Sequence, residues 1–529
     1  MTVRRAGKIM APENRCGCDY SNAGRWGQGK AVRKMVERKF DRILNNTIIL
    51  FSSRFFQKAL SFLLLVLLTR NLTTSDFGLY SFITVWIATV AAFTDMGTAG
   101  GGLRLWAAAP ARMAGAFGKL YLIRLLLSLP AVAGSLFVWF SLYSSLPSWG
   151  ILLISGGILL QIVNVSLVPF QAELLNRYPA LWAATNRTFL LLLIALALAL
   201  KAPLFWIVAL EIFFPIFYVA RLWHGAQKIV KRTRATSPSA PYSFRELARD
   251  IVPVGLLTLL IMAYFRIDVF MLMKMMGKKA VAEYAGGFRL VEPFLTIPGV
   301  LALSVFPVVV GRWTGNDRER AEETLRRQAR LGTLAMFLIG FLLSRHGGAL
   351  AIRFFGERYR SSTSVIEILA WTLPVSAWSY PWFGFVQADR KYSAAILLAL
   401  GALGINILGN LHAIPRWGTA GAAGFTLLTE SIWAIGLWRI SASKISGTGP
   451  LLLKLLSLSL VVLLFSFSLE LFLPANRVFR VLSTFAGLSL FSLLTFKLSL
   501  LDTEDKNGMA QYLRNLYSRV LSLYNSWRD

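Results

Sequence analysis

Apolar runs of about 18 residues or more recur through most of residues 47–500, and they constrain the fold more than any other feature of this sequence. A helical run of that length crosses the hydrocarbon core of a bilayer. Lipid offers no hydrogen-bond partners, so each run must satisfy its own backbone groups, as a helix does. The sequence therefore predicts an all-α integral membrane protein and not a soluble domain.

The runs predict about fourteen transmembrane helices, and a polar, basic loop divides the first twelve into six and six. An even number of helices in each half gives parallel repeats related by an axis along the membrane normal. We therefore expect two pseudo-symmetric six-helix bundles followed by two extra C-terminal helices. The predicted spans are residues 47–70, 79–101, 117–143, 149–174, 178–200, 203–225, 249–273, 284–310, 331–354, 363–386, 391–413, 418–441, 450–473 and 479–500.

This count predicts a linear division of the chain. The N-terminal tail is polar and Gly-rich, and Met35 is the hypothesised true start, so residues 1–34 need not be native. The C-terminal tail alternates apolar and basic residues at helical spacing, as in a helix that lies on a membrane surface. The predicted segments are the tail 1–46, the first bundle 47–225, the linker 226–248, the second bundle 249–441, helices 13 and 14 within 450–500, and the amphipathic tail 501–529.

Positive charge is the second strong feature, with 56 Lys and Arg against 26 Asp and Glu and a formal net charge of +30. In a chain that is 56% hydrophobic, such charge is typical of cytoplasmic loops and of contact with anionic lipid headgroups. The loops 104–124, 221–249 and 311–330 are the basic ones and would share one side of the membrane. We expect a bacterial inner-membrane protein with both termini in the cytoplasm and no nucleic-acid partner.

The sequence gives no support to an enzyme. It contains no P-loop, no H-E-x-x-H and no G-x-S-x-G motif. The two cysteines, Cys16 and Cys18, lie in the N-terminal tail without the paired ligands that a zinc site needs. We expect no metal and no cofactor, and leave coupling to H⁺ or Na⁺ open.

Charged and amide side chains inside the predicted spans are the candidate functional residues. A charge near the bilayer centre costs roughly 2.5–3.5 kcal/mol on insertion scales, so each one needs a reason. Turned toward one another, these side chains would line a wet cavity with more cations than carboxylates, which suits an anionic substrate. The candidates for substrate binding are Lys58, Arg124, Gln161, Asn164, Arg266 and Arg289, and those for ion coupling or charge balance are Asp95, Asp268, Glu292 and Glu430.

Structural roles are the alternative for each of these residues. Lys58, like Arg54, lies near a predicted interface and could extend its charge to the headgroups. Arg289 and Glu292 are three residues apart and could form an ion pair on one helix. Asp95 could pair with Arg104. The concentration of charges in both halves favours a functional cavity.

Several segments resemble motifs of polysaccharide flippases. Residues 69–80 resemble their R-x-L-x-x-x-D/E-F/Y-G-x-Y turn, with Asp76, Gly78 and Tyr80 at the matching positions. Residues 95–104 resemble their D-x-G…R helix end, residues 284–307 their Y…R…l-P…f-P helix, and residues 355–359 their f-G-x-x-Y turn. Residues 406–423 resemble N-x-x-x-N…I-P-x-y-G…G-A-A through Asn406, Asn410, Pro415 and Gly418. The chain is identified as similar to the polysaccharide-exporter branch of the multidrug/oligosaccharidyl-lipid/polysaccharide flippase superfamily.

The resemblance implies two facing bundles, alternating access and a cationic central cavity. It implies that the substrate is an undecaprenyl-diphosphate-linked oligosaccharide, flipped to the periplasmic leaflet, with membrane lipids, a glycan polymerase and chain-length machinery as partners. Residues 51–54 resemble the helix-1 F-S-R of lipid II flippases, which makes Arg54 the first expected substrate contact. Lys58 departs from the next cationic position of those flippases, which disfavours lipid II itself.

Three rival functions stay open at this stage. A cation-coupled multidrug exporter would share the architecture but should have an acidic cavity. A membrane glycan polymerase or ligase would need a sizeable extracytoplasmic loop, and a scaffold would leave the intramembrane charges without a purpose.

Overall fold

The computed structural model describes residues 53, 56–236, 239–315, 317–389, 391–472, 477–500 and 505. Within these ranges the secondary structure is helical and contains no strand, which confirms the predicted all-α class. Ten of the described helical segments are long and apolar enough to cross a bilayer. The chain is therefore a multi-pass membrane protein.

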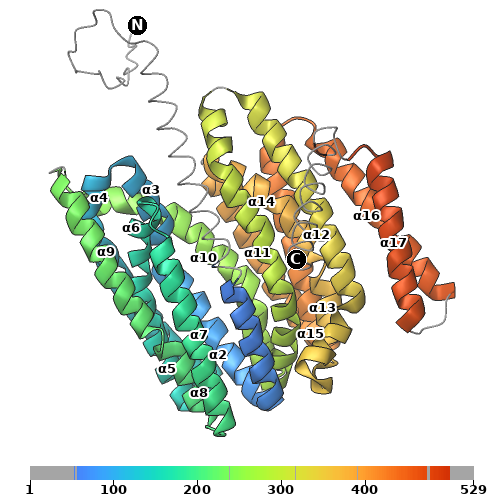
Figure 1. Ribbon diagram of the computed structural model, residues 1–529, viewed down its shortest axis with the longest axis horizontal. Coiled ribbons are helices and arrows are strands. Elements are labelled where there is room, and N and C mark those ends of the chain that lie inside the picture. The colour runs from blue at the N-terminus through green and yellow to red at the C-terminus, as the bar shows by residue number, and fades with distance from the viewer. Residues whose placement is uncertain are drawn as a thin grey trace, which may run out of the picture.

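The first half of the chain forms a helix over residues 56–71 and the elements α2 to α9 (Figure 1). These are α2 (Thr74–Asp95), α3 (Thr98–Ala108), α4 (Pro110–Leu142), α5 (Ser148–Leu160), η1 (Gln161–Ser166), α6 (Leu167–Ala172), α7 (Arg177–Ala199), α8 (Leu204–Phe213) and α9 (Ile216–Thr236). The second half continues with α10 (Phe244–Met275), α11 (Lys278–Thr314), α12 (Arg318–Phe355), η2 (Glu357–Tyr359), α13 (Ser362–Leu369), α14 (Thr372–Ala388), α15 (Tyr392–Ala442), α16 (Thr448–Phe472) and α17 (Arg477–Lys497).

Three predicted spans are interrupted, and one of them, predicted at 363–386, divides into α13 and α14. The span predicted at 79–101 divides into α2 and α3 at Met96 and Gly97, which both have positive φ (38° and 78°). The span predicted at 203–225 divides into α8 and α9 around Pro215, which has no backbone N–H to continue the helix.

Two other predictions need a smaller correction. The span predicted at 149–174 tightens into the 3₁₀ segment η1 at its centre. The spans predicted separately at 391–413 and 418–441 are joined in α15, which kinks at Gly418 (φ 59°, ψ −136°). Glycine adopts this backbone conformation without the steric penalty of a Cβ atom.

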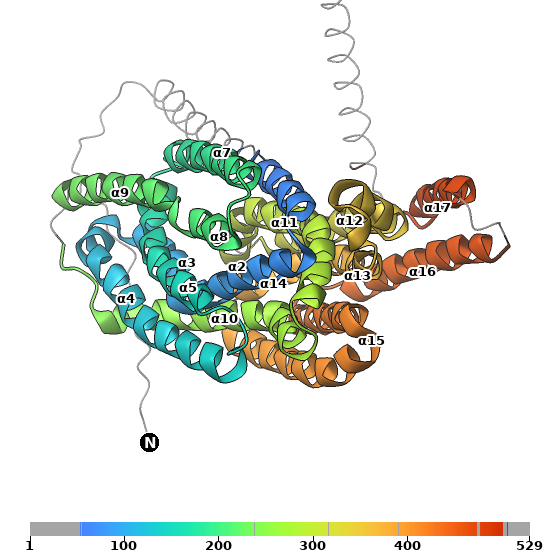
Figure 2. The ribbon, with the colours of Figure 1, turned by 90° about the horizontal axis from the view of Figure 1, so that it is seen from below.

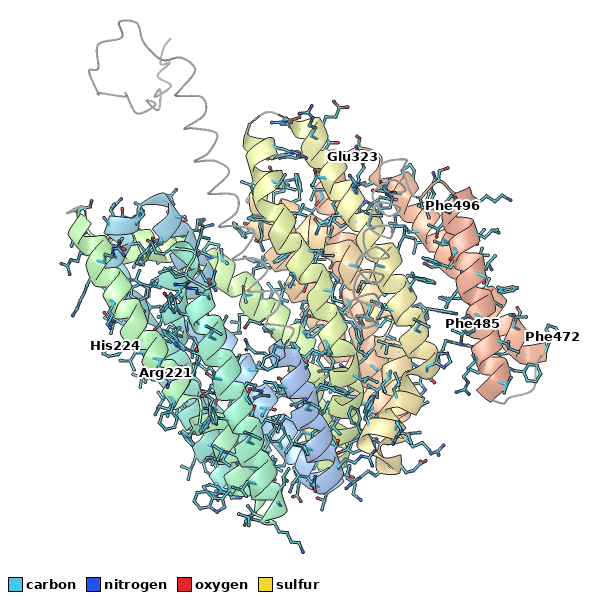
Figure 3. The ribbon with its side chains drawn as sticks, in the orientation of Figure 1. Arg221, His224, Glu323, Phe472, Phe485 and Phe496 are labelled. Carbon is cyan, nitrogen blue, oxygen red and sulfur yellow. The ribbon has the colours of Figure 1, made fainter. Side chains whose placement is uncertain are left out.

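The helices form two groups with an outer pair (Figures 1 and 2). The helices of the first half lie together on one side, and α10 to α15 lie together on the other. The groups meet where α2 of the first packs against α10 and α11 of the second, and α16 and α17 are outermost, beside α12. The outer pair exposes large aromatic side chains, including Phe472, Phe485 and Phe496 at 87%, 64% and 60% (Figure 3). Such surfaces suit contact with lipid tails.

A continuous apolar core joins the two groups along α2 and α11. The backbones of α2 and α11 approach closely at Gly78, which has no side chain. A Cβ atom there would lie 1.9 Å from the carbonyl oxygen of Lys278. The core side chains include Phe77, Phe82 and Trp86 of α2 and Val281, Tyr284 and Phe288 of α11.

Two arginines tie the groups together at one end of the molecule. Arg70, on the helix over 56–71, donates from Nε to the Phe354 carbonyl at 2.7 Å and also bonds the Arg353 carbonyl. Arg358, just beyond α12, donates back to the carbonyls of Leu72 at 2.8 Å and Arg70 at 2.7 Å. Each side chain therefore satisfies the carbonyls at the C-terminal end of a helix in the other half. We call this pair, Arg70 and Arg358, the reciprocal arginine clasp.

Candidate functional site

A cluster of charged side chains lies between the two halves at the level of α2, α10 and α11. Glu292 on α11 is its centre, with Oε1 3.3 Å from Nζ of Lys58 and 3.9 Å from Nη2 of Arg266. Lys58 comes from the helix over 56–71 and Arg266 from α10, so both halves contribute. The side chains remain partly open, at 40% for Lys58, 33% for Glu292 and 19% for Arg266.

Arg289 extends the cluster toward α2. Its Nη2 donates to Thr84 Oγ1 at 3.3 Å, and its guanidinium lies 5.6 Å from the ring centroid of Tyr80 and 5.9 Å from that of Phe77. Arg266 similarly lies 4.6 Å from the ring centroid of Phe288. Aromatic faces hold a guanidinium by cation–π attraction while leaving its N–H donors for a ligand.

A further ion pair beside this cluster was missed from the sequence. Arg187 on α7 donates to Glu211 on α8 at 2.7 Å, and both residues interact electrostatically with Tyr80, as Arg289 does. Arg187 and Glu211 both lie inside predicted spans. The free-energy cost of a charge in the membrane, which selected the other charged residues, applies equally to these two.

The central cluster, defined here as Lys58, Arg266, Arg289 and Glu292, holds three cations against one carboxylate. The neighbouring Arg187–Glu211 pair adds no net charge. A partly exposed site with this balance attracts an anion, and arginine matches the geometry of phosphate oxygens.

Arg124 and Asp95 lie apart from this cluster. Asp95 is eleven residues beyond Thr84, which is about 16 Å along α2. The two side chains form an ion pair, and the Arg124 side chain is only 5% exposed. Arg124 also donates to Thr98 Oγ1 at 2.7 Å and to the Gln161 carbonyl at 2.9 Å. The pair thus fastens the break between α2 and α3 to η1.

The alternative pairing of Asp95 with Arg104 is wrong. Arg104 instead contacts Asp250 on α10 at 2.8 Å. Asp95 accepts hydrogen bonds from the backbone of Gly97 at 3.2 Å and from Thr98 Oγ1 at 3.0 Å, which caps the start of α3.

Gln161 and Asn164 fall in η1 and bond each other through their side-chain amides. The Gln161 carbonyl accepts from Arg124, so these two residues belong to the Asp95–Arg124 network.

Asp268 and Glu430 are buried within the second half, at 1% and 5% exposure. Asp268 accepts from the Tyr284 hydroxyl, from Thr426 Oγ1 at 3.0 Å and from the Val269 backbone at 2.8 Å, which joins α10, α11 and α15. Glu430 interacts with the Tyr264 hydroxyl of α10. Arg54 lies outside the described residues.

The sequence matches the family model described as polysaccharide biosynthesis protein over residues 43–310, which is half of the chain. The chain belongs to this polysaccharide biosynthesis protein family. A second model, MatE, matches residues 253–411. No curated protein sequence matches.

Solved structures share the fold. The lipid II flippase MurJ in an inward closed conformation superposes with a TM-score of 0.57 at 14% identity, covering 84% of this chain and 98% of MurJ. A MATE in complex with MaL6 gives 0.55 at 15% identity, covering 76% and 96%. An outward-facing MATE transporter of the MOP superfamily gives 0.54 at 17% identity, covering 75% and 96%. The chain therefore shares the fold of MurJ and of the MATE transporters.

Residues of the family-like motifs occupy helix junctions. Asp76 and Thr73 cap α2, with the Asp76 backbone N–H donating to Thr73 Oγ1 at 3.1 Å. Tyr80 faces Arg289 from α2, while Gly78 permits the contact with α11.

The later motif shapes α15. Asn410 donates to Asn406 at 2.8 Å, and Asn406 donates to Thr429 at 3.2 Å, so a buried amide chain bridges the two arms of this helix. Pro415 and Gly418 mark the kink between those arms.

Proposed function

We propose that this chain is a flippase that moves an undecaprenyl-diphosphate-linked oligosaccharide across the bacterial inner membrane by alternating access. The supporting observation is the central cluster, where cations from both halves surround one carboxylate in a partly exposed site. Membership of the polysaccharide biosynthesis protein family supports a glycan-bearing substrate. Lys58, Arg266 and Arg289 would bind the diphosphate, and the polyprenyl tail would stay in lipid.

The two halves give the proposal its mechanism. A diphosphate bound by Lys58 from one half and by Arg266 and Arg289 from the other would compete with Glu292 for its ion pairs. Ligand binding could thereby change which contacts hold the halves together, as alternating access requires. We place the basic end of the molecule, with the loops near residues 109, 240 and 316, in the cytoplasm.

Ion coupling belongs to the same proposal. Asp268 and Glu430 are buried carboxyl groups in the second half, where proton or sodium binding could alter the packing of α10 against α15. Asp95 is a weaker candidate because Arg124 already neutralises it. A glycan polymerase and chain-length machinery would act on the flipped product.

A multidrug exporter of cationic compounds is the main rival, since MATE transporters share the fold. The excess of cations in the central cluster disfavours it, because a cationic drug would be repelled there.

A strain that lacks this gene tests the proposal. The knockout should accumulate the lipid-linked oligosaccharide with its sugar on the cytoplasmic leaflet, and wild-type protein should reverse this. The Arg266→Gln/Arg289→Gln variant, expressed at the wild-type level, should fail to reverse it. Full reversal by that variant would contradict the proposed role of the cluster.

A further inference from the structure

A large cavity lies between α11 and α12, with a volume of about 750 Å³. Its lining follows one stripe of each helix, as single residues and adjacent pairs that recur after three or more residues. The residues lining it are Ile297, Pro298, Leu301, Val305 and Arg312 on α11 and Arg320, Glu323, Thr324, Arg327, Gln328, Leu331, Gly332, Ala335 and Met336 on α12.

The lining changes from apolar to basic along the helices. Ile297, Leu301 and Val305 face Leu331 and Ala335 at the deep end, and arginines occur only at the opposite end. Ile297 and Arg312 are fifteen positions apart, which is about 22 Å of helix. That length matches one leaflet of a bilayer with its headgroups, which is about 20–22 Å thick. The cavity therefore has the polarity and depth of one leaflet.

The basic end holds three arginines, each of which already makes at least one contact. Arg312 donates to Thr324 Oγ1 at 2.6 Å, Arg320 pairs with Asp317 at 3.5 Å while its side chain is 76% exposed, and Arg327 pairs with Asp505 at 2.7 Å. A guanidinium has five N–H donors, so the exposed Arg320, and Arg312, whose two contacts both use Nη1, keep donors for a phosphate. Glu323, the one acidic lining residue, is bonded by Arg326 at 2.9 Å.

The cavity is separate from the central cluster. Successive residues of an α-helix turn by 100°, so Leu301 lies half a turn around α11 from Glu292 and about 120° from Arg289. A molecule in the cavity would meet the face of α11 that turns away from the transport site. This placement favours a lipid of the surrounding bilayer over the transported carrier.

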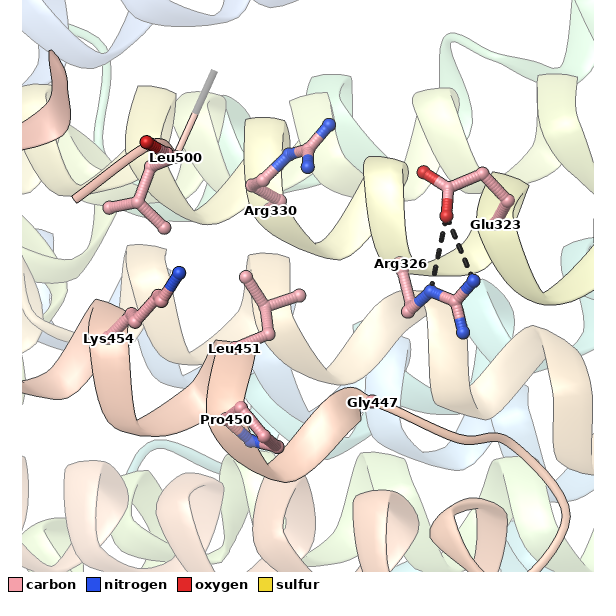
Figure 4. A pocket seen from close by; sticks show the side chains of 9 residues that line it. Glu323, Arg326, Arg330, Gly447, Pro450, Leu451, Lys454 and Leu500 are labelled. Carbon is pink, nitrogen blue, oxygen red and sulfur yellow. Dashed lines mark hydrogen bonds and ion pairs between the residues drawn. The ribbon is translucent and has the colours of Figure 1, made fainter. Parts of the chain in front are cut away.

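A smaller pocket on the other side of α12 provides a contrast. It measures about 190 Å³, lies between α12 and α16, and includes Arg326, Arg330 and Lys454 (Figure 4). It is basic like the mouth of the large cavity, but it is too small for an acyl chain. Of these two pockets, the α11–α12 cavity is the one that has both a basic end and an apolar wall as deep as one leaflet.

We propose that the α11–α12 cavity binds an anionic phospholipid of the leaflet at the basic end, as a resident lipid of the protein. Its phosphate contacts Arg312 and Arg320, Arg327 adds positive charge at the same end, and one acyl chain lies on Ile297, Leu301, Val305, Leu331 and Ala335. The lipid fills the space between α11 and α12 and is not itself transported. This site goes beyond the proposed function and does not depend on it.

Native mass spectrometry of the full chain from mixed micelles tests this proposal, with dioleoyl phosphatidylglycerol and dioleoyl phosphatidylcholine as the probes. Both lipids carry a phosphate, but the choline cation of phosphatidylcholine would be repelled by the arginines. Phosphatidylglycerol should therefore be retained about tenfold more strongly than phosphatidylcholine. Equal retention of the two lipids would overturn the proposal. Inorganic phosphate should not displace the bound lipid; displacement would reduce the site to an anion site without a chain.

Two variants separate the headgroup from the chain. Arg320→Gln removes a largely exposed guanidinium and should lower the preference for phosphatidylglycerol severalfold, while Arg318→Gln, a neighbouring arginine that does not line the cavity, should not. Ala335→Phe fills the apolar end and should reduce retention of both lipids. Wild-type retention in both Arg320→Gln and Ala335→Phe would contradict the assignment.

A carrier probe distinguishes this site from the transport site. Undecaprenyl diphosphate should leave the phosphatidylglycerol in place, and the Arg266→Gln/Arg289→Gln variant should retain it as the wild type does. Displacement by undecaprenyl diphosphate would make the cavity a carrier site and overturn the resident-lipid assignment. Failure of flipping with retained phospholipid would instead count only against the proposed function.

Discussion

At the scale of single residues, the central cluster depends on one carboxylate. Glu292 contacts Lys58 and Arg266, and without it three cations would stand together in a partly exposed site. Breaking a pair while its partner stays desolvated costs more than the pair itself contributes. The effects of changing these charges on stability should therefore depend on one another.

A charge swap tests this coupling. Lys58→Glu places a second carboxylate where the ammonium lies 3.3 Å from Glu292, and Glu292→Lys adds a fourth cation, so each single variant should lower thermal stability. The double variant Lys58→Glu/Glu292→Lys should recover most of the loss, as measured by the melting temperature in detergent. A double variant that is no more stable than the worse single variant would rule out the pairing.

Asp95 and Arg124 make a second residue-scale prediction. Asp95→Asn leaves the buried guanidinium without its carboxylate and should destabilise the protein by about 3–5 kcal/mol. Asp250→Asn is a matched control, because its pair with Arg104 is about 40% exposed on both sides and should cost only about 0–1 kcal/mol. Thermal unfolding measures both. An Asp95→Asn protein with wild-type stability but altered ion dependence would instead make Asp95 a coupling residue.

At the scale of helices, the contact between α2 and α11 requires glycine. Gly78→Ala would force a methyl group into the Lys278 carbonyl, and the resulting overpacking should cost about 1–3 kcal/mol. Gly134→Ala on α4 is the control, since a Cβ atom there would meet nothing within 4 Å. Equal melting temperatures for the two variants would show that the helices do not approach so closely.

The reciprocal arginine clasp gives a prediction about movement. Arg70→Gln/Arg358→Gln removes the four charged contacts that hold the ends of the helix over 56–71 and α12 together. Spin labels at Asn71 and Ser361, introduced as cysteines, should then report a longer and broader distance than in the parent protein.

Arg360→Gln is the control for the clasp, because Arg360 pairs locally with Glu357. The distances in the two variants therefore separate the loss of contacts between the halves from the loss of contacts inside one loop. An unchanged distance in the Arg70→Gln/Arg358→Gln protein would show that the clasp does not hold that end closed.

At the scale of the whole molecule, the helices were predictable because apolar length alone specifies them. The interruptions of the helices were less predictable. Met96 is an apolar residue, yet it has positive φ. The chain packs closely against α10 at this point, where a Cβ atom on Gly255 would lie 2.1 Å from the Met96 carbonyl carbon. Two other interruptions have a proline in the sequence: Pro215 lies at the break between α8 and α9, and Pro415 lies three residues before Gly418.

The sequence predicted which charged residues form the candidate site better than it predicted which of them pair with one another. Lys58, Arg266, Arg289 and Glu292 were selected by the cost of charge in lipid, and the structure brings them together. Which carboxylate each cation meets depends on helix rotation and depth, so the alternative pairing of Asp95 with Arg104 was wrong. The roles of these residues in binding remain predictions, as do those of Arg54 and the two tails, which lie outside the described residues except for Asp505.

Flipping by purified protein in vesicles measures the central claim most directly. Vesicles containing the wild-type protein should transfer an undecaprenyl-diphosphate-linked oligosaccharide between leaflets, as scored by the fraction of sugar open to an impermeant enzyme. The Arg289→Gln protein should be slower by about tenfold or more, the effect of losing one charge-assisted phosphate contact. Equal transfer by the two proteins, or equal transfer of an uncharged polyprenyl glycan by the wild type, would contradict the account.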